Sequence, residues 1–209
     1  KCDRSTAALV HIGGGRKTIN LACSGALTAT TGSRAKGNFK PGIDTVQTND
    51  GRGQLATLKE FDKTHTIDTV VLSIGGNDFG FGNVIMSCIG AFMSWDGYCK
   101  DDPEVQAMFT PTKIKEKTTL IANAIIRLRQ TLDSTGQTQA KIIVNTYPTP
   151  LARGDKTRTS ETYWSRFLSN GCPFYSADMT WAAGYVSPTV SNSVRNAVSE
   201  SKVPGVRLL

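Results

Sequence analysis

Four short apolar runs, separated by long polar stretches, organise the chain. They are TINLAC (18–23), TVVLSI (69–74), KIIVNTY (141–147) and GVRLL (205–209). Each is rich in β-branched residues and shorter than an ordinary helix, which is typical of strands. Because the apolar residues follow one another almost without alternation, both faces of these strands should be covered, as in a parallel sheet. The pattern predicts four strands.

Apolar residues at helical spacing predict helices between these strands. The clearest helix begins at Thr110-Pro111 and ends before Gly136, with Ile114, Ile121, Ile125, Leu128 and Leu132 on one face. A second helix is expected after Pro188, with its valines on one side, and a third over LATLKEFDK (55–63). Strands that alternate with helices indicate the α/β class.

The length of 209 residues suits one well-buried domain, so we expect a single domain over residues 1–209. The stretches 26–52 and 148–180 are rich in Gly, Thr, Ser and Pro and show no periodicity. Loops of this length usually shape a site or are held by disulfides. No apolar run approaches the roughly 18 residues of a membrane span, so no integral membrane segment is expected.

The formal net charge of +7 raises the question of an anionic partner. The basic residues are scattered, and the densest groups, at 113–117 and 153–158, lack the interleaved aromatic residues of a nucleic-acid stacking platform. We therefore expect no nucleic-acid partner.

The cysteines and histidines favour disulfides over a metal site. Only His11 and His65 accompany the cysteines, which form no CxxC pair and stand at positions 2, 23, 88, 99 and 172. No metal and no cofactor are expected. Spaced cysteines are typical of a secreted protein, with Cys2–Cys23 and Cys88–Cys99 as the nearest pairs. Cys172 is then either a buried free thiol or bonded to a cysteine outside this sequence.

Candidate chemistry lies where the predicted strands end. In an open parallel sheet, ligands bind beyond the carboxyl ends of the strands. The segment around Gly25 follows the first strand, and Gly-Gly-Asn77-Asp78 follows the second. An amide and a close backbone N–H suit stabilisation of the oxyanion that forms when an ester carbonyl is attacked. Gly-Asn-Asp is equally ordinary turn chemistry, so the residues alone leave both interpretations open.

Neither histidine is placed to act as a general base. His11 and His65 precede their strands, so both belong to the opposite end of the sheet. We interpret both as surface or structural side chains, because a base must reach the reacting proton within hydrogen-bonding distance.

These segments resemble a known family. NLACSGA (20–26) and VVLSIGGNDFGF (70–81) are similar to the second and third sequence blocks of the SGNH, or GDSL, hydrolases, particularly the secreted actinobacterial-type lipases and esterases. KCDRS (1–5), the cysteine pair 88 and 99, and IIVNTYPTP (142–150) also resemble that subgroup.

The resemblance implies a three-layer α/β/α sandwich around a central parallel sheet, in the flavodoxin-like arrangement of the family. It implies a monomer that cleaves small-molecule or lipid esters through an acyl-enzyme without a cofactor. Gly25, through its backbone N–H, and Asn77, through its side-chain amide, would be the oxyanion-hole donors. We expect Asp78 to cap the following turn, because a carboxylate beside an oxyanion would oppose its charge.

The sequence departs from the family at both ends. The GDS block that supplies the serine and the Asp-x-x-His block that supplies the base do not occur. Ser5, Ser24 and Ser73 are not placed to substitute for that serine. We therefore expect the chain to be an inner part of a longer hydrolase and to be inactive by itself. By the same resemblance, Cys172 would pair with a cysteine nearer the C-terminus of the complete protein. The alternative is a non-catalytic module of this fold that binds carbohydrate or lipid.

The substrate class is left open by the sequence. The region from Ile85 to Met108, with Phe109 just after it, contains several aromatic residues. Phe92, Trp95 and Tyr98 could line an apolar wall for an acyl chain, and packing in a core is an equal alternative.

Overall fold

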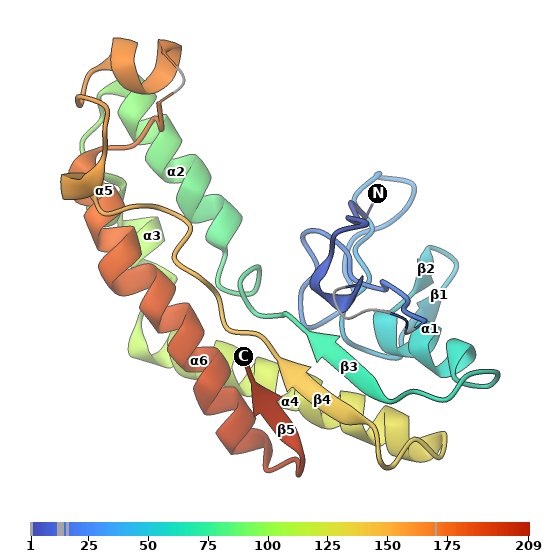
Figure 1. Ribbon diagram of the computed structural model, residues 1–209. Helices are drawn as coiled ribbons and strands as arrows, with labels where there is room; N and C mark the ends of the chain where they lie inside the picture. Colours follow the sequence, from blue (N-terminus) through green and yellow to red (C-terminus); the bar gives the residue numbers. More distant parts are fainter. Residues whose placement is uncertain (1, 12–14, 16, 170) are drawn as a thin grey trace. The chain divides into compact units, whose positions relative to one another are not determined.

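The computed structural model describes residues 2–11, 15, 17–169 and 171–209 (Figure 1). Their contacts divide the chain into two compact units. Unit 1 comprises Lys1–Asn77, Thr118–Thr146 and Val194–Leu209, and unit 2 comprises Asp78–Lys117 and Tyr147–Ser193. Two long helices, α4 (Pro111–Ser134) and α6 (Ser187–Ser201), contribute residues to both units.

Unit 1 contains a parallel sheet. Among the described residues it has three strands, β3 (Thr69–Leu72), β4 (Lys141–Val144) and β5 (Val206–Leu208), in the order β3-β4-β5 (Figure 1). Both pairings are parallel. The structure therefore confirms the α/β class and three of the four predicted strands.

The prediction of a strand over residues 18–23 is wrong, because these residues have no sheet partner. The backbone groups of Ala22 are bound by side chains instead. The side-chain oxygen of Asn20 accepts the N–H of Ala22 (3.1 Å), and the carbonyl of Ala22 accepts a hydrogen bond from Arg4 Nε (2.8 Å). A short polar side chain that binds the backbone two residues on competes with a sheet ladder.

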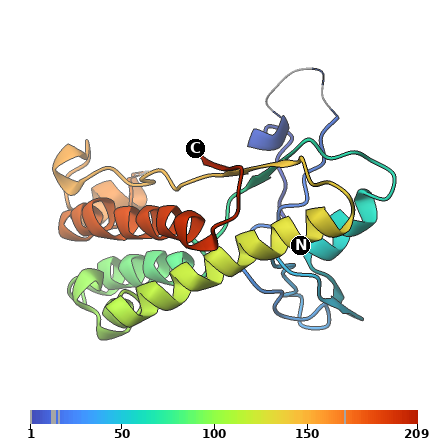
Figure 2. The same cartoon turned by 90° about the horizontal axis from the view of Figure 1, so that it is seen from below.

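Helix α4 covers the sheet of unit 1, but the expected burial of both strand faces is incomplete, since β3 is mostly half-buried and β5 has two exposed residues. The carboxyl-terminal part of α4 lies on one face of the sheet (Figure 2), and its apolar side chains are fully buried, as the 0% exposure of Ile121, Ile125 and Leu132 shows. The strands contribute Ile142 and Val144 to the same core. Helix α1 (Gln54–Phe61) matches the predicted helix at 55–63.

The loop between Ala26 and α1 is held in a fixed conformation by polar contacts within unit 1. It contains a small antiparallel pair, β1 (Gln47–Thr48) and β2 (Gly51–Arg52), and a bridge between Thr31 and Lys40. Arg127 of α4 donates to the carbonyls of Thr28 (3.0 Å) and Ile43 (3.1 Å). The loop is thereby tied to the helix that covers the sheet. A 3₁₀ turn, η1 (Leu9–His11), precedes it.

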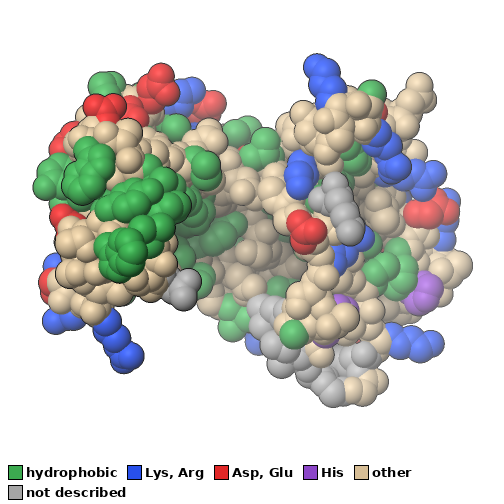
Figure 3. All heavy atoms as spheres, turned by 90° about the horizontal axis from the view of Figure 1, so that it is seen from above, with side chains coloured by type: hydrophobic (Ala, Val, Ile, Leu, Met, Phe, Trp, Pro, Cys, Tyr) green, Lys and Arg blue, Asp and Glu red, His purple; other side chains and the backbone are tan. Residues whose placement is uncertain are grey.

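Unit 2 is built mainly of helices. In chain order these are α2 (Phe81–Ser94), η2 (Cys99–Asp101), α3 (Pro103–Ala107), the start of α4, η3 (Gly154–Lys156), η4 (Trp164–Leu168), α5 (Ser176–Trp181), η5 (Ala182–Val186) and the start of α6. The sequence pattern did not predict α2 or α3. Seen from above, hydrophobic side chains gather on one face of this unit (Figure 3).

Helical structure begins earlier than the predicted start after Pro188. The segments α5, η5 and α6 follow one another without a break from Ser176 to Ser201. The intervening η5 is a π-helical turn. Its wider hydrogen-bond pattern gives room for Pro188, whose ring would otherwise meet the carbonyl four residues earlier.

The aromatic residues considered for a wall or for a core differ in their exposure. Phe92 and Phe109 are each 3% exposed and belong to the core of unit 2. Phe109 lies against the ring of Phe79, with 6.2 Å between ring centres. Trp95 and Tyr98 are 69% and 44% exposed. Core packing therefore accounts for the two phenylalanines.

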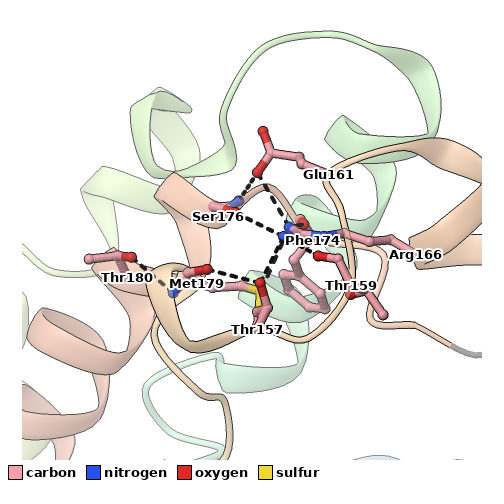
Figure 4. Close-up of polar contacts among 9 residues, drawn as sticks. Thr157, Thr159, Glu161, Arg166, Phe174, Ser176, Met179 and Thr180 are labelled. Carbon is pink, nitrogen blue, oxygen red and sulfur yellow. Dashed lines mark hydrogen bonds and ion pairs between the residues drawn. The ribbon is translucent and has the colours of Figure 1, made fainter.

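A buried arginine organises the loops of unit 2 (Figure 4). Arg166 is 1% exposed. Its guanidinium donates to the carbonyl of Phe174 and to the hydroxyls of Ser176 (2.8 Å) and Thr157 (3.2 Å), and it lies 3.4 Å from Glu161. Although partial burial opposes the shift, hydrogen bonds from Ser176 and the charge of Arg166 hold the pKa of Glu161 below its ordinary value.

A second buried charge joins α5 to the turn η2. Asp178 is fully buried, and its carboxylate accepts the N–H groups of Cys99 (3.2 Å) and Lys100 (3.0 Å). Burial raises the pKa of Asp178, and the two backbone hydrogen bonds oppose that shift without cancelling it.

Both cysteine pairs expected from the sequence form disulfides. Cys2 bonds to Cys23 and Cys88 bonds to Cys99, with Cα separations of 4.5 and 4.7 Å. Cys172 is a half-buried free thiol among the described residues, and burial raises its pKa. No helix in the described part of the chain has both the length and the apolar character needed to cross a membrane.

We expect the Cys88–Cys99 disulfide to stabilise unit 2 measurably. Replacing both cysteines by serine should lower the free energy of unfolding by about 2–4 kcal/mol, because the unfolded chain gains conformational freedom. Urea unfolding followed by circular dichroism measures the change. Cys172→Ser is the control, since it removes a thiol that forms no disulfide among the described residues. Equal stability of the double variant and the parent would contradict the expectation.

Candidate functional site

The turn that carries Gly25 requires a glycine. Ala26 N–H donates to the carbonyl of Cys23 (3.1 Å), which closes a turn over Ser24 and Gly25. Gly25 has φ +75°, in the left-handed region that glycine adopts without strain. Gly25 is exposed, and its N–H is paired with no acceptor among the described residues. The turn therefore presents a backbone donor to solvent.

Asn77 lies in the turn that follows β3 and contacts this glycine turn. Its side-chain nitrogen donates to the carbonyl of Ala26 (2.9 Å). An amide NH₂ carries two donors, so this bond leaves the second N–H of Asn77 for another acceptor. The structure thus brings Asn77 beside the Gly25 turn across a sequence separation of 51 residues.

The first glycine of the Gly-Gly-Asn-Asp segment serves packing. Gly75 has φ +112°, and a Cβ atom placed on it would lie 2.5 Å from Cδ1 of Ile121. Ile121 belongs to α4 and is fully buried. Gly75 therefore lets the end of β3 approach α4 closely, and this approach helps to fix the position of the turn that contains Asn77. Packing against α4 therefore accounts for this glycine.

Lys40 lies at the site, although no sequence pattern predicted it there. Its Nζ would lie 3.4 Å from a Cβ atom on Gly25, so the ammonium group is next to the glycine turn. A positive charge there favours a negatively charged oxygen at the exposed N–H of Gly25. The bridge between Lys40 and Thr31 helps to bring this side chain to the turn, and no sequence periodicity marks such a contact.

The histidines and the internal serines are bound locally in unit 1. His11 is hydrogen-bonded to Thr18 (2.6 Å), and His65 stacks on Phe61 with 4.1 Å between ring centres. Ser24 donates to the carboxylate of Asp3 (3.0 Å). Ser73 follows the last residue of β3 and is exposed. Among the described residues, no hydrogen bond joins a histidine to one of these serines.

The only cluster of metal-ligating groups found in the described residues is unsuited to a metal ion. It comprises Cys88, Cys99 and Asp178, all buried. The two sulfur atoms are bonded to each other, so they are not free thiolates. The carboxylate of Asp178 already accepts two backbone N–H groups. This cluster is structural.

Comparison with known proteins adds no relative to this picture. No family model, no curated protein and no solved structure matches the chain. The functional class therefore depends on the residues themselves and on the geometry of the Gly25 and Asn77 turns.

Proposed function

We propose that the complete protein is a secreted serine ester hydrolase of the SGNH type, with the three-layer α/β/α sandwich of that family. The observation that supports this proposal most directly is the contact between the Asn77 amide and the carbonyl of Ala26, beside the exposed N–H of Gly25. Two unrelated segments thus present hydrogen-bond donors at one place.

The chemical role of these donors follows from the charge that ester cleavage creates. When a serine attacks an ester carbonyl, the carbonyl oxygen becomes negative and the bond to it becomes single. The N–H of Gly25 and the second N–H of Asn77 would donate to that oxygen, and Lys40 would add a favourable charge. One such donor typically contributes about 3–4 kcal/mol to transition-state stabilisation.

In this proposal the nucleophilic serine and the base histidine come from the complete protein outside residues 1–209. The serine alkoxide forms an acyl-enzyme and the alcohol leaves with the proton taken up by histidine; water then hydrolyses the acyl-enzyme. No cofactor takes part. Because β3 forms one edge of the sheet, a further strand can pair with it on the side away from β4.

Labelling with a fluorophosphonate tests the class of enzyme. The complete protein is incubated with the probe, its intact mass is measured, and the modified peptide is mapped. A single adduct on a serine outside residues 1–209, abolished by denaturing the protein before labelling, is the expected result. Absence of an adduct on folded protein, in parallel with a labelled serine hydrolase as positive control, would refute the proposal in favour of a non-catalytic binding module.

A further inference from the structure

A pocket of about 870 Å³ in unit 1 is separate from the Gly25 and Asn77 turns. Its lining includes three arginines, Arg4, Arg34 and Arg52, and contains no acidic residue. Leu21, Phe39 and Pro41 give it an apolar part. Sites for small molecules commonly have volumes of about 300–1,000 Å³ and combine apolar walls with a few polar groups.

Two of the arginines are anchored in a way that leaves their outer nitrogens for a ligand. Arg4 donates from Nε to the carbonyl of Ala22 (2.8 Å), and Arg34 donates from Nε to the carbonyl of Asp50. Among the described residues, neither guanidinium has a hydrogen-bond acceptor at its two terminal nitrogens, and neither forms an ion pair with a carboxylate. The terminal nitrogens of a guanidinium form a fork that matches two oxygens of one anion.

Arg34 has further contacts that restrain it. Its backbone N–H donates to the carboxylate of Asp50 (2.7 Å), and its guanidinium lies 5.8 Å from the centre of the Phe39 ring. A guanidinium held at Nε and against an aromatic face loses less conformational freedom when it binds a ligand. Asp50 thus binds the backbone N–H and the Nε of Arg34, and among the described residues no hydrogen bond joins it to the terminal nitrogens.

The segment from Phe39 to Pro41 forms a wall of the pocket, and its other face is turned to the glycine turn. Lys40 pairs with Thr31 in an extended bridge, so neighbouring side chains point to opposite faces. Phe39 and Pro41 line the pocket, whereas Lys40 lies against Gly25. The arginine pocket is therefore a second site, and neither Gly25 nor Asn77 belongs to its lining.

We propose that this arginine pocket binds a phosphate ester, with the phosphate on the guanidinium groups of Arg34, Arg4 and Arg52 and the organic group against Phe39, Leu21 and Pro41. Three positive charges match a phosphate monoester dianion better than a single carboxylate. The proposal goes beyond the proposed hydrolase, because it needs neither Gly25 nor Asn77 and no ester cleavage.

Isothermal titration of the complete protein tests this assignment, with inorganic phosphate and phenyl phosphate as soluble probes. We expect saturable binding of both, with phenyl phosphate the tighter ligand because its ring adds apolar contact. Arg34→Gln and Arg52→Gln should each weaken phenyl phosphate binding about 10-fold or more, as expected for loss of a charge-assisted hydrogen bond. Arg34→Lys should weaken it as well, since a lysine keeps the charge without the fork.

The control is Arg158→Gln, which makes the same change of charge at an exposed position of unit 2. Equal weakening by Arg158→Gln would show that only net charge matters and would overturn the proposal, as would the absence of saturable binding to every probe. Circular dichroism melts verify that each variant is folded.

Vesicles of phosphatidylglycerol in phosphatidylcholine distinguish a lipid headgroup from a free phosphate ester. Vesicle binding that depends on Arg34 and Arg52, without binding of the soluble probes, assigns the pocket to a phospholipid headgroup. Binding of the soluble probes alone assigns it to a free phosphate ester. Since these measurements do not involve ester hydrolysis, their failure and a failure of fluorophosphonate labelling are independent outcomes.

Discussion

Asn77→Ala in the complete protein is expected to lower the turnover number on a chromogenic ester by about 10²- to 10³-fold, which is the usual cost of removing one oxyanion-hole donor. The amide of Asn77 would bind the oxyanion more strongly than the ground-state carbonyl, so KM should change much less than kcat. Steady-state kinetics with p-nitrophenyl esters measure both constants.

The control for this prediction is Asn196→Ala, which removes an exposed amide from α6. It should leave kcat unchanged. Because Asn77 also donates to the carbonyl of Ala26, thermal melts of both variants are needed to separate a loss of folded protein from a loss of catalysis. An unchanged kcat in folded Asn77→Ala would remove this residue from the oxyanion hole.

Arg166→Ala is expected to have the largest effect on stability, lowering the free energy of unfolding by about 3–5 kcal/mol through lost hydrogen bonds and the cavity it leaves. The change leaves the carbonyl of Phe174 without its donor and the carboxylate of Glu161 without the charge beside it. It also opens a cavity where a fully buried side chain stood. Urea unfolding followed by tryptophan fluorescence measures the loss.

Arg158→Ala provides the comparison, since Arg158 is an exposed arginine of the same loop region. Its effect should stay within about 0.5 kcal/mol, as for most surface substitutions. A similar small effect for Arg166→Ala would mean that the contacts drawn in Figure 4 contribute little to stability.

The parts of the fold that could be predicted are those in which local pattern and burial agree. The strands β3 and β4 are mostly apolar and contribute Leu72, Ile142 and Val144 to the core, and α4 has a clear apolar face. The segment 18–23 looks similar in sequence, but Asn20 binds the local backbone and no neighbouring strand competes for it. Helix α2 was missed because it is apolar on most sides and contains Gly82 and Gly90.

The candidate site was predictable only in part. Gly25 and Asn77 were expected at one edge of the sheet, and they do meet, although the segment before Gly25 is not a strand. Their contact depends on a turn and one hydrogen bond. Lys40 and the arginine pocket arise from the loop between Ala26 and α1, whose path is set by tertiary contacts such as those of Arg127. Such contacts leave no periodic trace in a single sequence.

The carboxylates of Glu161, which is exposed, and Asp178, which is fully buried, act in opposite senses on the stability of unit 2 when protons bind. The lowered pKa of Glu161 gives a contribution to stability that is full above its unfolded value and is lost as the pH falls through the folded value. The raised pKa of Asp178 gives a contribution that is full below its unfolded value and is lost as the pH rises through the folded value. In mild acid the protonation of Asp178 therefore offsets part of the loss at Glu161, so unit 2 carries an internal compensation against changes in acidity.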